Sequence, residues 1–330
     1  MKLKAFTRTL TLLFTLILLL AFCSCGQAKV DSELEIKISV LNGTTGFGMA
    51  KLMNDKTEGK TDLNYTFSVE TDASLITAAL IKGEIDIAAL PTNAASTIYN
   101  KTEGGVQVLA INTLGVLYVV ENGNTVTSLA DLEGKTVYCP AQNPAFIFES
   151  ICKKAGVNVT VDTQYAQPAN LMAAVASATE PMIAVLPEPV LTLAMNKNSD
   201  LRVALDLTAE WNAAFGNSSL LQGCIVARTE FVETHKNEID RFLEEYRASI
   251  AFLSEDVDAA AKCIVKAGVY TNPQGEDAAI AIVKKAIPKC NVAFLAGDDM
   301  KTALSEFLSV MYEAAPASVG GATPEDNFYY

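Results

Sequence analysis

The chain has 330 residues, with 25 Lys+Arg against 38 Asp+Glu, one histidine and a formal net charge of −13 at pH 7. A surface with this excess of acids repels nucleic acid, so no nucleic-acid partner is expected. Because the sequence has one histidine, seven cysteines and no Cys-x-x-Cys pair, it argues against a zinc or iron–sulfur site, and we expect neither metal nor cofactor.

Residues 1–24 are typical of a secretory signal peptide. Three cations among the first eight residues precede an apolar run over residues 10–22, which is too short to span a bilayer comfortably. The run ends in FCSCG, similar to the cleavage box of bacterial lipoproteins. Cys25, after the small Ser24, is the expected lipid acceptor and Cys23 the alternative; ordinary cleavage with free secretion is the other interpretation. Cleavage before Cys25 leaves 22 Lys+Arg against 38 Asp+Glu, a net charge of −16.

A first α/β segment follows a short linker over residues 25–32. Residues 35–41 alternate polar and apolar side chains and predict a strand, which leads into a loop over residues 42–46 and then a helix. Asp72 can cap a helix over residues 73–82, and an apolar strand over residues 85–90 follows. Further strands are predicted at residues 106–112 and 115–121, so strands alternate with helices, as in mostly parallel α/β sheets.

The segment from Ala73 to Lys101 is repeated without a gap from Ala169 to Lys197, an offset of 96 positions with ten of 29 residues identical. Each copy predicts a helix, a short apolar strand ending in Leu-Pro, a polar loop and a second helix. Two copies of one α/β unit indicate two lobes, and a cleft between lobes is where small molecules usually bind.

The remaining residues extend this arrangement. The segment over residues 129–135 marks the start of the second α/β unit. Amphipathic helices are predicted farther along the chain, at residues 236–253, 258–266, 277–286 and 299–313. We expect lobe I to contain residues 33–121 and 224–330 and lobe II residues 122–223. The chain would then cross between lobes twice, which makes a hinge.

Four segments together resemble the solute-binding proteins of ABC importers. They are the loop Gly43-Thr44-Thr45-Gly46, ALIKGEIDIA (residues 79–88), LADLEGK (residues 129–135) and Leu186-Pro187-Glu188-Pro189. The resemblance is to the nitrate, sulfonate, taurine and thiamine-precursor binders, and it covers essentially all of the chain after the signal.

This resemblance implies the type II periplasmic-binding fold, an α/β fold in which each of two lobes is a mostly parallel sheet flanked by helices, joined by a double-crossover hinge. It also implies a solute held between the lobes and delivered to a membrane permease driven by an ATPase. We expect a monomer that is tethered by its lipid to the extracytoplasmic face of the membrane, and not an enzyme.

Four loops follow strand ends, at residues 42–46, 91–93, 142–144 and 187–189, where helix N-termini offer unpaired N–H groups. We expect ligand contacts from residues in or beside these loops: Thr44, Thr45, Phe47, Asp72, Thr92, Asn93, Gln142, Asn143 and Glu188.

Five of these residues also have a structural interpretation. Thr44 and Thr45 could simply cap a helix, and Asp72 is better explained as an N-cap than as a ligand group. Phe47, like other aromatic residues of the chain, could belong to the core instead of stacking on a flat ligand. Glu188, between two prolines, would select a cation or a hydrogen-bond donor, whereas its alternative role is a solvated loop acid.

The ligand class follows from the charges near the loops. None of the four arginines after the signal lies in a predicted cleft loop, so no bidentate clamp for an anion is visible. With Glu188 present, we favour a neutral or cationic ligand such as a nitrogen heterocycle related to a thiamine precursor. A sulfonate or nitrate-type anion held by helix N-termini is the alternative.

Two other functions remain open. The chain could be the ligand-binding subunit of a sensor, or an enzyme, because pyrimidine synthases and menaquinone-pathway enzymes resemble this fold. Such an enzyme would want histidines, a metal cluster or a base with a paired nucleophile, whereas the one histidine, His235, lies at the polar start of a predicted surface helix. A Cys263–Cys290 disulfide is left open, and the cysteines outside the signal are otherwise expected to be buried.

Overall fold

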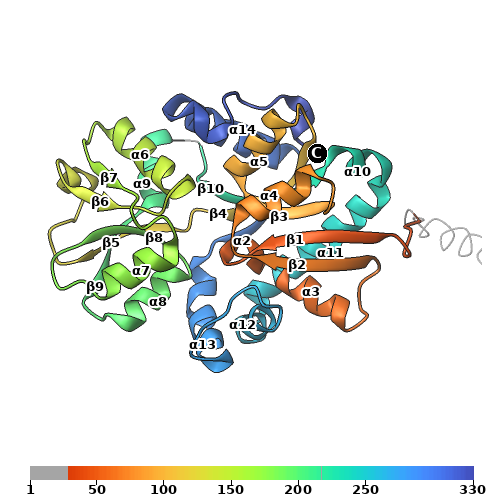
Figure 1. The fold of residues 1–330 in the computed structure, drawn as a ribbon, viewed down its shortest axis with the longest axis horizontal. Helices are drawn as coiled ribbons and strands as arrows, with labels where there is room; N and C mark the ends of the chain where they lie inside the picture. The colour runs from red at the N-terminus through yellow and green to blue at the C-terminus, as the bar shows by residue number, and fades with distance from the viewer. Residues whose placement is uncertain (1–28, 217) are drawn as a thin grey trace, which may run out of the picture. The chain divides into compact units, whose positions relative to one another are not determined.

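Two β-sheets organise the chain, and strands alternate with helices through most of it, which confirms the predicted fold class (Figure 1). The computed structural model describes residues 29–216 and 218–330. By its contacts the chain divides into Met1–Asp31 and Ser32–Tyr330, and the second unit carries the fold. The predicted signal peptide, with Cys23 and Cys25, lies outside the described residues. No helix within the described residues is long and apolar enough to cross a bilayer.

The first sheet has six strands in the order β11-β4-β10-β3-β1-β2. Strand β1 pairs in parallel with β2 and β3, whereas β10 runs antiparallel to β3 and β4, and β11 runs antiparallel to β4. The strands are β1 (Glu35–Leu41), β2 (Asn64–Glu70), β3 (Ile87–Pro91), β4 (Val106–Leu114), β10 (Leu221–Arg228) and β11 (Val292–Leu295).

The second sheet has five strands in the order β7-β6-β8-β5-β9. Strand β6 is parallel to β7 and β8, and β5 is antiparallel to β8 and β9. The strands are β5 (Leu117–Asn122), β6 (Thr136–Tyr138), β7 (Thr160–Asp162), β8 (Ile183–Pro187) and β9 (Leu201–Asp206).

Strand β5 lies in the second sheet, although the sequence assigned residues 117–121 to lobe I. Only Gly115 and Val116 separate β4 from β5, so the chain passes between sheets there and not near Glu121. Alternation of side chains predicts that a strand forms, but it carries no information about which sheet the strand joins. The return passage ends where β10 begins, at Leu221, close to the predicted position.

The helices confirm the repeat found in the sequence. Helices α4 (Ala73–Ile81) and α5 (Thr92–Lys101) flank β3, and α7 (Pro168–Ala176) and α8 (Val190–Lys197) flank β8 in the same order. Leu90 and Leu186, the equivalent leucines of the two Leu-Pro pairs, are both fully buried. The other helices are α2 (Thr44–Phe47), α3 (Ala50–Thr57), α6 (Asn143–Ala155), α9 (Leu207–Phe215), α10 (Thr229–Thr234), α11 (Lys236–Glu255), α12 (Val257–Lys266), α13 (Glu276–Ala286) and α14 (Gly297–Ala314), with 3₁₀ turns η1 (Leu129–Leu132), η2 (Ile287–Lys289), η3 (Pro316–Val319) and η4 (Asp326–Phe328).

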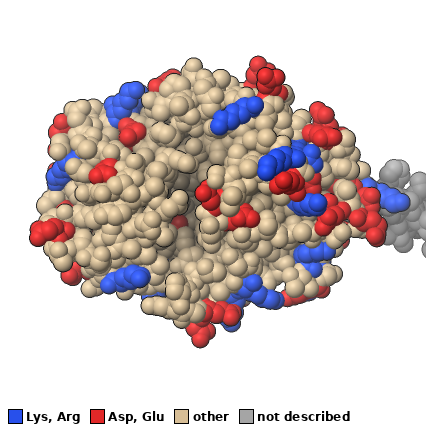
Figure 2. All heavy atoms as spheres, viewed as in Figure 1, with Lys and Arg blue, Asp and Glu red and all other residues tan. Residues whose placement is uncertain are grey.

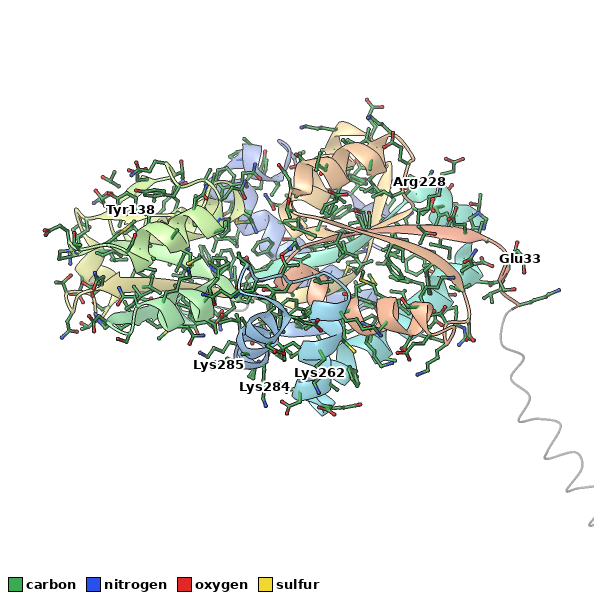
Figure 3. The ribbon with its side chains drawn as sticks, turned by 60° about the horizontal axis from the view of Figure 1, so that its bottom comes forward. Glu33, Tyr138, Arg228, Lys262, Lys284 and Lys285 are labelled. Atoms are coloured by element: carbon green, nitrogen blue, oxygen red, sulfur yellow. The ribbon has the colours of Figure 1, made fainter. Side chains whose placement is uncertain are left out.

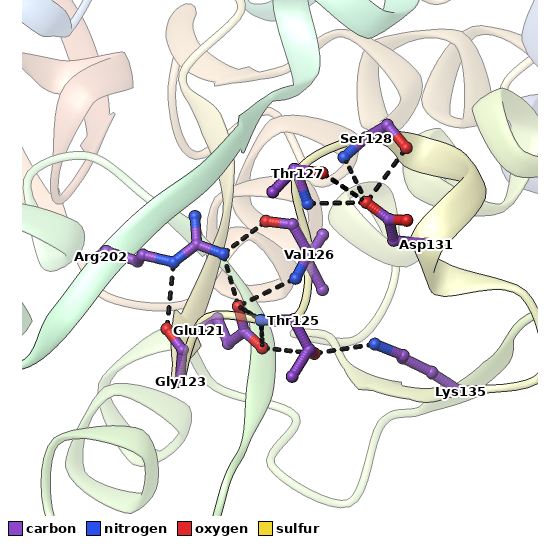
Figure 4. Close-up of polar contacts among 9 residues, drawn as sticks. All are labelled: Glu121, Gly123, Thr125, Val126, Thr127, Ser128, Asp131, Lys135 and Arg202. Carbon is purple, nitrogen blue, oxygen red and sulfur yellow. Dashed lines mark hydrogen bonds and ion pairs between the residues drawn. The ribbon is translucent and has the colours of Figure 1, made fainter.

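The connection between β5 and β6 is fixed by two carboxylates (Figure 4). The side chain of Glu121, 1% exposed, accepts hydrogen bonds from the backbone N–H groups of Thr125 and Val126 and pairs with Arg202 at 2.6 Å. Asp131 accepts bonds from residues 127 and 128 and closes a capping box on η1. The LADLEGK segment, which contains Asp131, therefore helps to fix the conformation of the connection between β5 and β6.

All five cysteines within the described residues are free, so the Cys263–Cys290 disulfide is not formed. Four of them are buried and Cys263 is half-buried, which agrees with the expectation that they behave as small apolar side chains.

Candidate functional site

Loops from the two sheets meet at the ends of β1 and β8. The Thr44 hydroxyl, at the start of α2, donates a hydrogen bond of 2.6 Å to the backbone oxygen of Glu188, which directly follows β8. The backbone N–H of Glu188 donates to Val116, on the passage between the sheets. Two residues that the sequence predicted as ligand contacts from opposite lobes are therefore in direct contact.

The Glu188 carboxylate is buried and is not a solvated loop acid, since the residue is 2% exposed. Its Oε2 accepts a 3.1 Å bond from the Thr192 backbone N–H and its Oε1 accepts a 3.0 Å bond from the Thr192 hydroxyl. Burial raises the pKa of Glu188 above its ordinary value, although the bonds from Thr192 and the charge of Lys289 oppose that change. The carboxylate thus caps the first turn of α8.

Three titratable groups that the sequence did not indicate lie close enough to sense the charge of Glu188. Burial first, then the charges of Asp206 and Glu188, raise the pKa of Tyr118 to about 12. Burial and Glu188 also raise the pKa values of Tyr270 and Cys290. The Cys290 sulfur lies 4.0 Å from the Thr44 hydroxyl oxygen. The Glu188 carboxylate therefore lies within electrostatic range of two tyrosines, a cysteine and Lys289.

Two asparagines begin helices and carry unpaired buried oxygens. Asn93 is the second residue of α5 and Asn143 the first residue of α6, and their exposed fractions are 9% and 6%. Neither Oδ1 atom has a hydrogen-bond donor within the described residues. The Nε2 of Gln222, on β10, is likewise buried and unpaired. Because an unpaired buried polar group costs ~1–3 kcal/mol, these atoms are suited to pair with a ligand or with water.

Thr92 and Thr45 join the polar region where the chain passes between the sheets. The fully buried Thr92 hydroxyl donates a 3.3 Å bond to the Leu221 backbone oxygen, at the start of β10. The Thr45 backbone oxygen accepts a 2.8 Å bond from Asn112 of β4. Asn112 was overlooked in the sequence, although a buried-strand pattern interrupted by an amide is a detectable signal.

The other three predicted residues are placed differently. Phe47 is fully buried in a hydrophobic cluster with residues of α12 and α13, as its core interpretation predicts, and its contact with a ligand stays a prediction. Asp72 is exposed and its Oδ1 accepts a 2.8 Å bond from the Ser74 N–H, which confirms the capping interpretation. Gln142 is exposed and precedes α6 with φ of 66°, and no structural role for its side chain is evident.

A hollow lies between the part of the molecule that carries the five-stranded sheet and the part that carries the six-stranded sheet (Figure 2). In this view its walls are mainly uncharged, and acidic side chains border it. Two shallow cavities, of about 230 and 190 Å³, lie elsewhere: one between α3 and α11, the other between α6 and α14. Within residues 29–216 and 218–330, no group of three His, Cys, Asp or Glu side chains could hold a metal ion.

Solved structures with the same fold are named as transport proteins. An ABC transporter from Parabacteroides distasonis is 23% identical, with a TM-score of 0.73 over 91% of this chain and 99% of that chain. The periplasmic aliphatic sulphonate binding protein SsuA from Escherichia coli is 13% identical, with a TM-score of 0.68 over 90% and 92% of the two chains. The alkanesulfonate-binding protein SsuA from Xanthomonas axonopodis pv. citri, bound to MOPS, is 12% identical, with a TM-score of 0.64 over 90% and 96%.

At these identities the similarity establishes the fold alone, and that fold is the two-sheet fold of periplasmic binding proteins. No curated protein matches the chain. A family model described as "Menaquinone biosynthesis" matches residues 51–312, which is well over half of the sequence. The chain has the type II periplasmic-binding fold and belongs to this family.

Proposed function

We propose that this protein captures a small solute between two lobes and delivers it to the permease of an ABC importer. The observation that carries the proposal is the contact between Thr44 and Glu188, because it joins the strand-end loops of two separate sheets at 2.6 Å. In α/β folds a ligand binds beyond the carboxyl ends of strands, where these loops lie. The names of the structurally similar proteins support the same role.

The lobes that we propose follow the sheets. Lobe I contains residues 33–116 and 221–330, and lobe II contains residues 117–220. These boundaries differ by a few residues from those expected from the sequence, because β5 pairs with β8 and β9. The two passages between the sheets would form the hinge.

The ligand that fits best is neutral or cationic and rich in hydrogen-bond donors, as in a nitrogen heterocycle related to a thiamine precursor. The unpaired oxygens of Asn93 and Asn143 can accept bonds from such donors, and Glu188 adds a carboxylate that would repel an anion. The names of the sulfonate binders favour the opposite class, an alkanesulfonate or a similar anion. An anion would instead be held by the N–H groups of helix N-termini, and protonation of Glu188 would remove its repulsion.

We further propose that the chain is a monomeric lipoprotein on the extracytoplasmic face of the membrane. The lipid would be attached at Cys25, and the partners would be the permease and its ATPase. Metabolic labelling with a radioactive fatty acid, compared between the wild type and a Cys25→Ala variant, tests this point. Incorporation that persists in the variant would move the attachment to Cys23, and absence of incorporation in the wild type would refute the anchor.

A second candidate is an enzyme of menaquinone biosynthesis, which the family description favours. The two candidates differ in the fate of the bound molecule. A binding protein returns its ligand chemically unchanged after prolonged incubation, whereas an enzyme converts it. Mass spectrometry of the recovered small molecule distinguishes these outcomes directly.

The main test of solute capture is mass spectrometry of molecules that copurify with the protein, followed by thermal-shift measurements with nitrogen heterocycles, alkanesulfonates and nitrate. A ligand at 100 times its Kd stabilises the folded state by ~2.7 kcal/mol. For about 300 folded residues this raises Tm by ~4 °C. If no compound in the panel shifts Tm and nothing copurifies, solute capture is refuted.

A matched pair of variants tests the ligand class. We expect Glu188→Gln to remove the shift produced by a cationic or donor-rich ligand while the ligand-free protein stays folded. Glu180→Gln, an exposed acid of the same lobe, should leave the shift unchanged. If an alkanesulfonate binds tightly and binds more tightly still to Glu188→Gln, the ligand is an anion and the proposed ligand class is wrong. The proposal of solute capture would still stand.

A further inference from the structure

The C-terminal segment that follows α14 lies along one face of α5 (Figure 1). Three side chains of that face, Asn93, Ser96 and Asn100, donate hydrogen bonds to backbone oxygens of residues 318–322. The Ser96 hydroxyl and the Asn100 amide both bind the Val319 oxygen, at 2.8 and 2.9 Å. A second oxygen of the segment accepts from the same Asn100 amide at 2.7 Å. Because residues three and four apart share one side of a helix, this face of α5 presents a row of donors to the segment.

The segment is held in place at both of its ends. At its start, the N–H of Ser318 donates a 2.8 Å bond to the Ala315 oxygen within η3. At its other end, Phe328 is fully buried, and the N–H of Tyr330 donates a 3.0 Å bond to the Val108 oxygen of β4. The carbonyl groups that face α5 therefore have fixed positions.

The contact with this segment decides which end of the Asn93 amide faces it. The Nδ2 atom of Asn93 lies 3.4 Å from the Ser318 backbone oxygen. A carbonyl oxygen only accepts hydrogen bonds, so the amide must turn its N–H end toward Ser318 and its Oδ1 atom away. Asn93 is 9% exposed, and its Oδ1 atom has no donor within residues 29–216 and 218–330. Asn93 thus makes one long bond and keeps one unpaired acceptor, whereas Asn100 makes two short bonds.

The unpaired acceptor lies where the chain returns from the five-stranded sheet to the six-stranded sheet. Thr92 donates its hydroxyl to the backbone oxygen of Leu221, the first residue of β10. Asn93 directly follows Thr92, and Gln222, whose Nε2 atom is buried and unpaired, directly follows Leu221. One unpaired acceptor and one unpaired donor therefore adjoin the same hydrogen bond, and a polar solute can satisfy both.

The cations labelled in Figure 3 lie elsewhere. Arg228 pairs with the buried Asp86 at 2.7 Å. Three lysines lie on α12 and α13, away from α5 in Figures 1 and 3: Lys262, Lys284 and Lys285. None of these four side chains is placed to hold an anion against the Asn93 oxygen.

We propose that Asn93 is a specificity-determining residue of the solute site, and that the C-terminal segment sets this specificity by fixing the Asn93 oxygen as the atom that the solute meets. The proposal rests on the solute-capture function proposed above. The solute then carries an N–H or O–H donor at this point, as an amino group on a nitrogen heterocycle does. A sulfonate or nitrate has acceptors alone, so it would set oxygen against oxygen there and is disfavoured.

A first test compares two variants of the full chain without any solute. Asn100→Ala removes two short bonds, which for about 300 folded residues should lower Tm by ~3 °C. Asn93→Ala removes one long bond together with an unpaired buried oxygen, so we expect a Tm within ~1 °C of the wild type. A Tm loss for Asn93→Ala as large as that for Asn100→Ala would show that the Asn93 oxygen is already paired, through water, and would overturn the proposal.

A second test measures the Kd values of 4-aminopyrimidine and 4-methylpyrimidine by calorimetry. These compounds have similar shapes, but one has an NH₂ donor where the other has a CH₃ group. We expect the wild type to bind the amino compound about tenfold more tightly or better, because the methyl compound leaves the buried Asn93 oxygen unpaired. Asn93→Ala should abolish this preference. Asn100→Ala should keep it, since Ser96 still holds the Val319 oxygen beside Ser318.

The outcomes separate this proposal from solute capture itself. Equal affinity of the wild type for the two pyrimidines, or a preference that survives in Asn93→Ala, would overturn the role of Asn93 while solute capture stands. Tighter binding of an alkanesulfonate or nitrate than of either pyrimidine would do the same. If no compound of the panel binds and nothing copurifies, solute capture fails and this proposal fails with it. If Asn93→Ala does not fold, the preference of the wild type still decides.

Discussion

The buried ion pair between Glu121 and Arg202 gives a stability prediction whose size can be worked out from the structure. In Glu121→Gln, the new amide group must face N–H donors of Thr125, Val126 or Arg202 in place of a carboxylate oxygen. Removing one member of a buried pair costs ~3–5 kcal/mol. Because the Arg202 side chain is 31% exposed and can be hydrated, we take the lower end, about 3 kcal/mol.

This loss translates into a measurable change in melting temperature. For about 300 folded residues the unfolding entropy is ~0.6 kcal/mol/K, so about 3 kcal/mol lowers Tm by ~5 °C. Circular dichroism melts at pH 7 measure it. Asp131→Asn is the matched control: this carboxylate also accepts several bonds in the same connection but is only half-buried, so a smaller shift is expected. A Tm for Glu121→Gln equal to that of the wild type would refute the reasoning.

The same carboxylate has a defined pH signature. Although burial raises the pKa of Glu121, bonds from Thr125, Val126 and Arg202 outweigh that effect and hold it below the ordinary value of 4.5. A lowered folded-state pKa contributes stability that is present above the unfolded value and is lost as pH falls through the folded value. The difference in Tm between the wild type and Glu121→Gln should therefore shrink below pH 4.5. A constant difference down to strongly acidic pH would contradict this account.

Further predictions concern Glu188, Gly115 and Phe307. Burial raises the pKa of Glu188, so this residue's contribution to stability is present below pH 4.5 and declines as pH rises through the pKa of the folded state. The free energy of unfolding of Glu188→Gln, measured in urea, should lack that decline. A pH profile parallel to that of the wild type would contradict this expectation. Gly115→Ala places a methyl group against the Thr208 hydroxyl and should cost ~1–3 kcal/mol, measured by thermal melting; an unchanged Tm would show that α9 can shift away. Phe307→Ala should cost ~3–5 kcal/mol and shift the emission of Trp211 to the red, and an emission maximum identical to that of the wild type would refute the packing of Phe307 against Trp211.

Local patterns in the sequence predicted much of the fold. The alternation over residues 35–41 matches β1, and the repeated Leu-Pro segments match the ends of β3 and β8. Asp72 caps α4 as expected, because an N-cap depends only on residues two or three positions away. These features are encoded within short windows of the chain, where side-chain type and spacing suffice.

Part of the candidate site was also predictable. Polar residues after strand ends pointed to Thr44, Asn93, Asn143 and Glu188, and the structure buries all four. The contact of Thr44 with Glu188 joins residues 144 positions apart, and no short pattern encodes such a pairing. Tyr118, Tyr270 and Cys290 were not predicted near Glu188 for the same reason.

By itself, the sequence determined the α/β class, the duplicated unit and the positions of most helix and strand ends, because periodicity and capping act over a few residues. Only the tertiary structure decided that β5 joins the second sheet, that Phe47 belongs to the core and that α14 packs against both β4 and α6. Those outcomes depend on which apolar faces pack together across the whole chain. Contacts between residues far apart in the sequence determine which apolar faces are buried against each other, and short sequence patterns do not identify the residues that will meet.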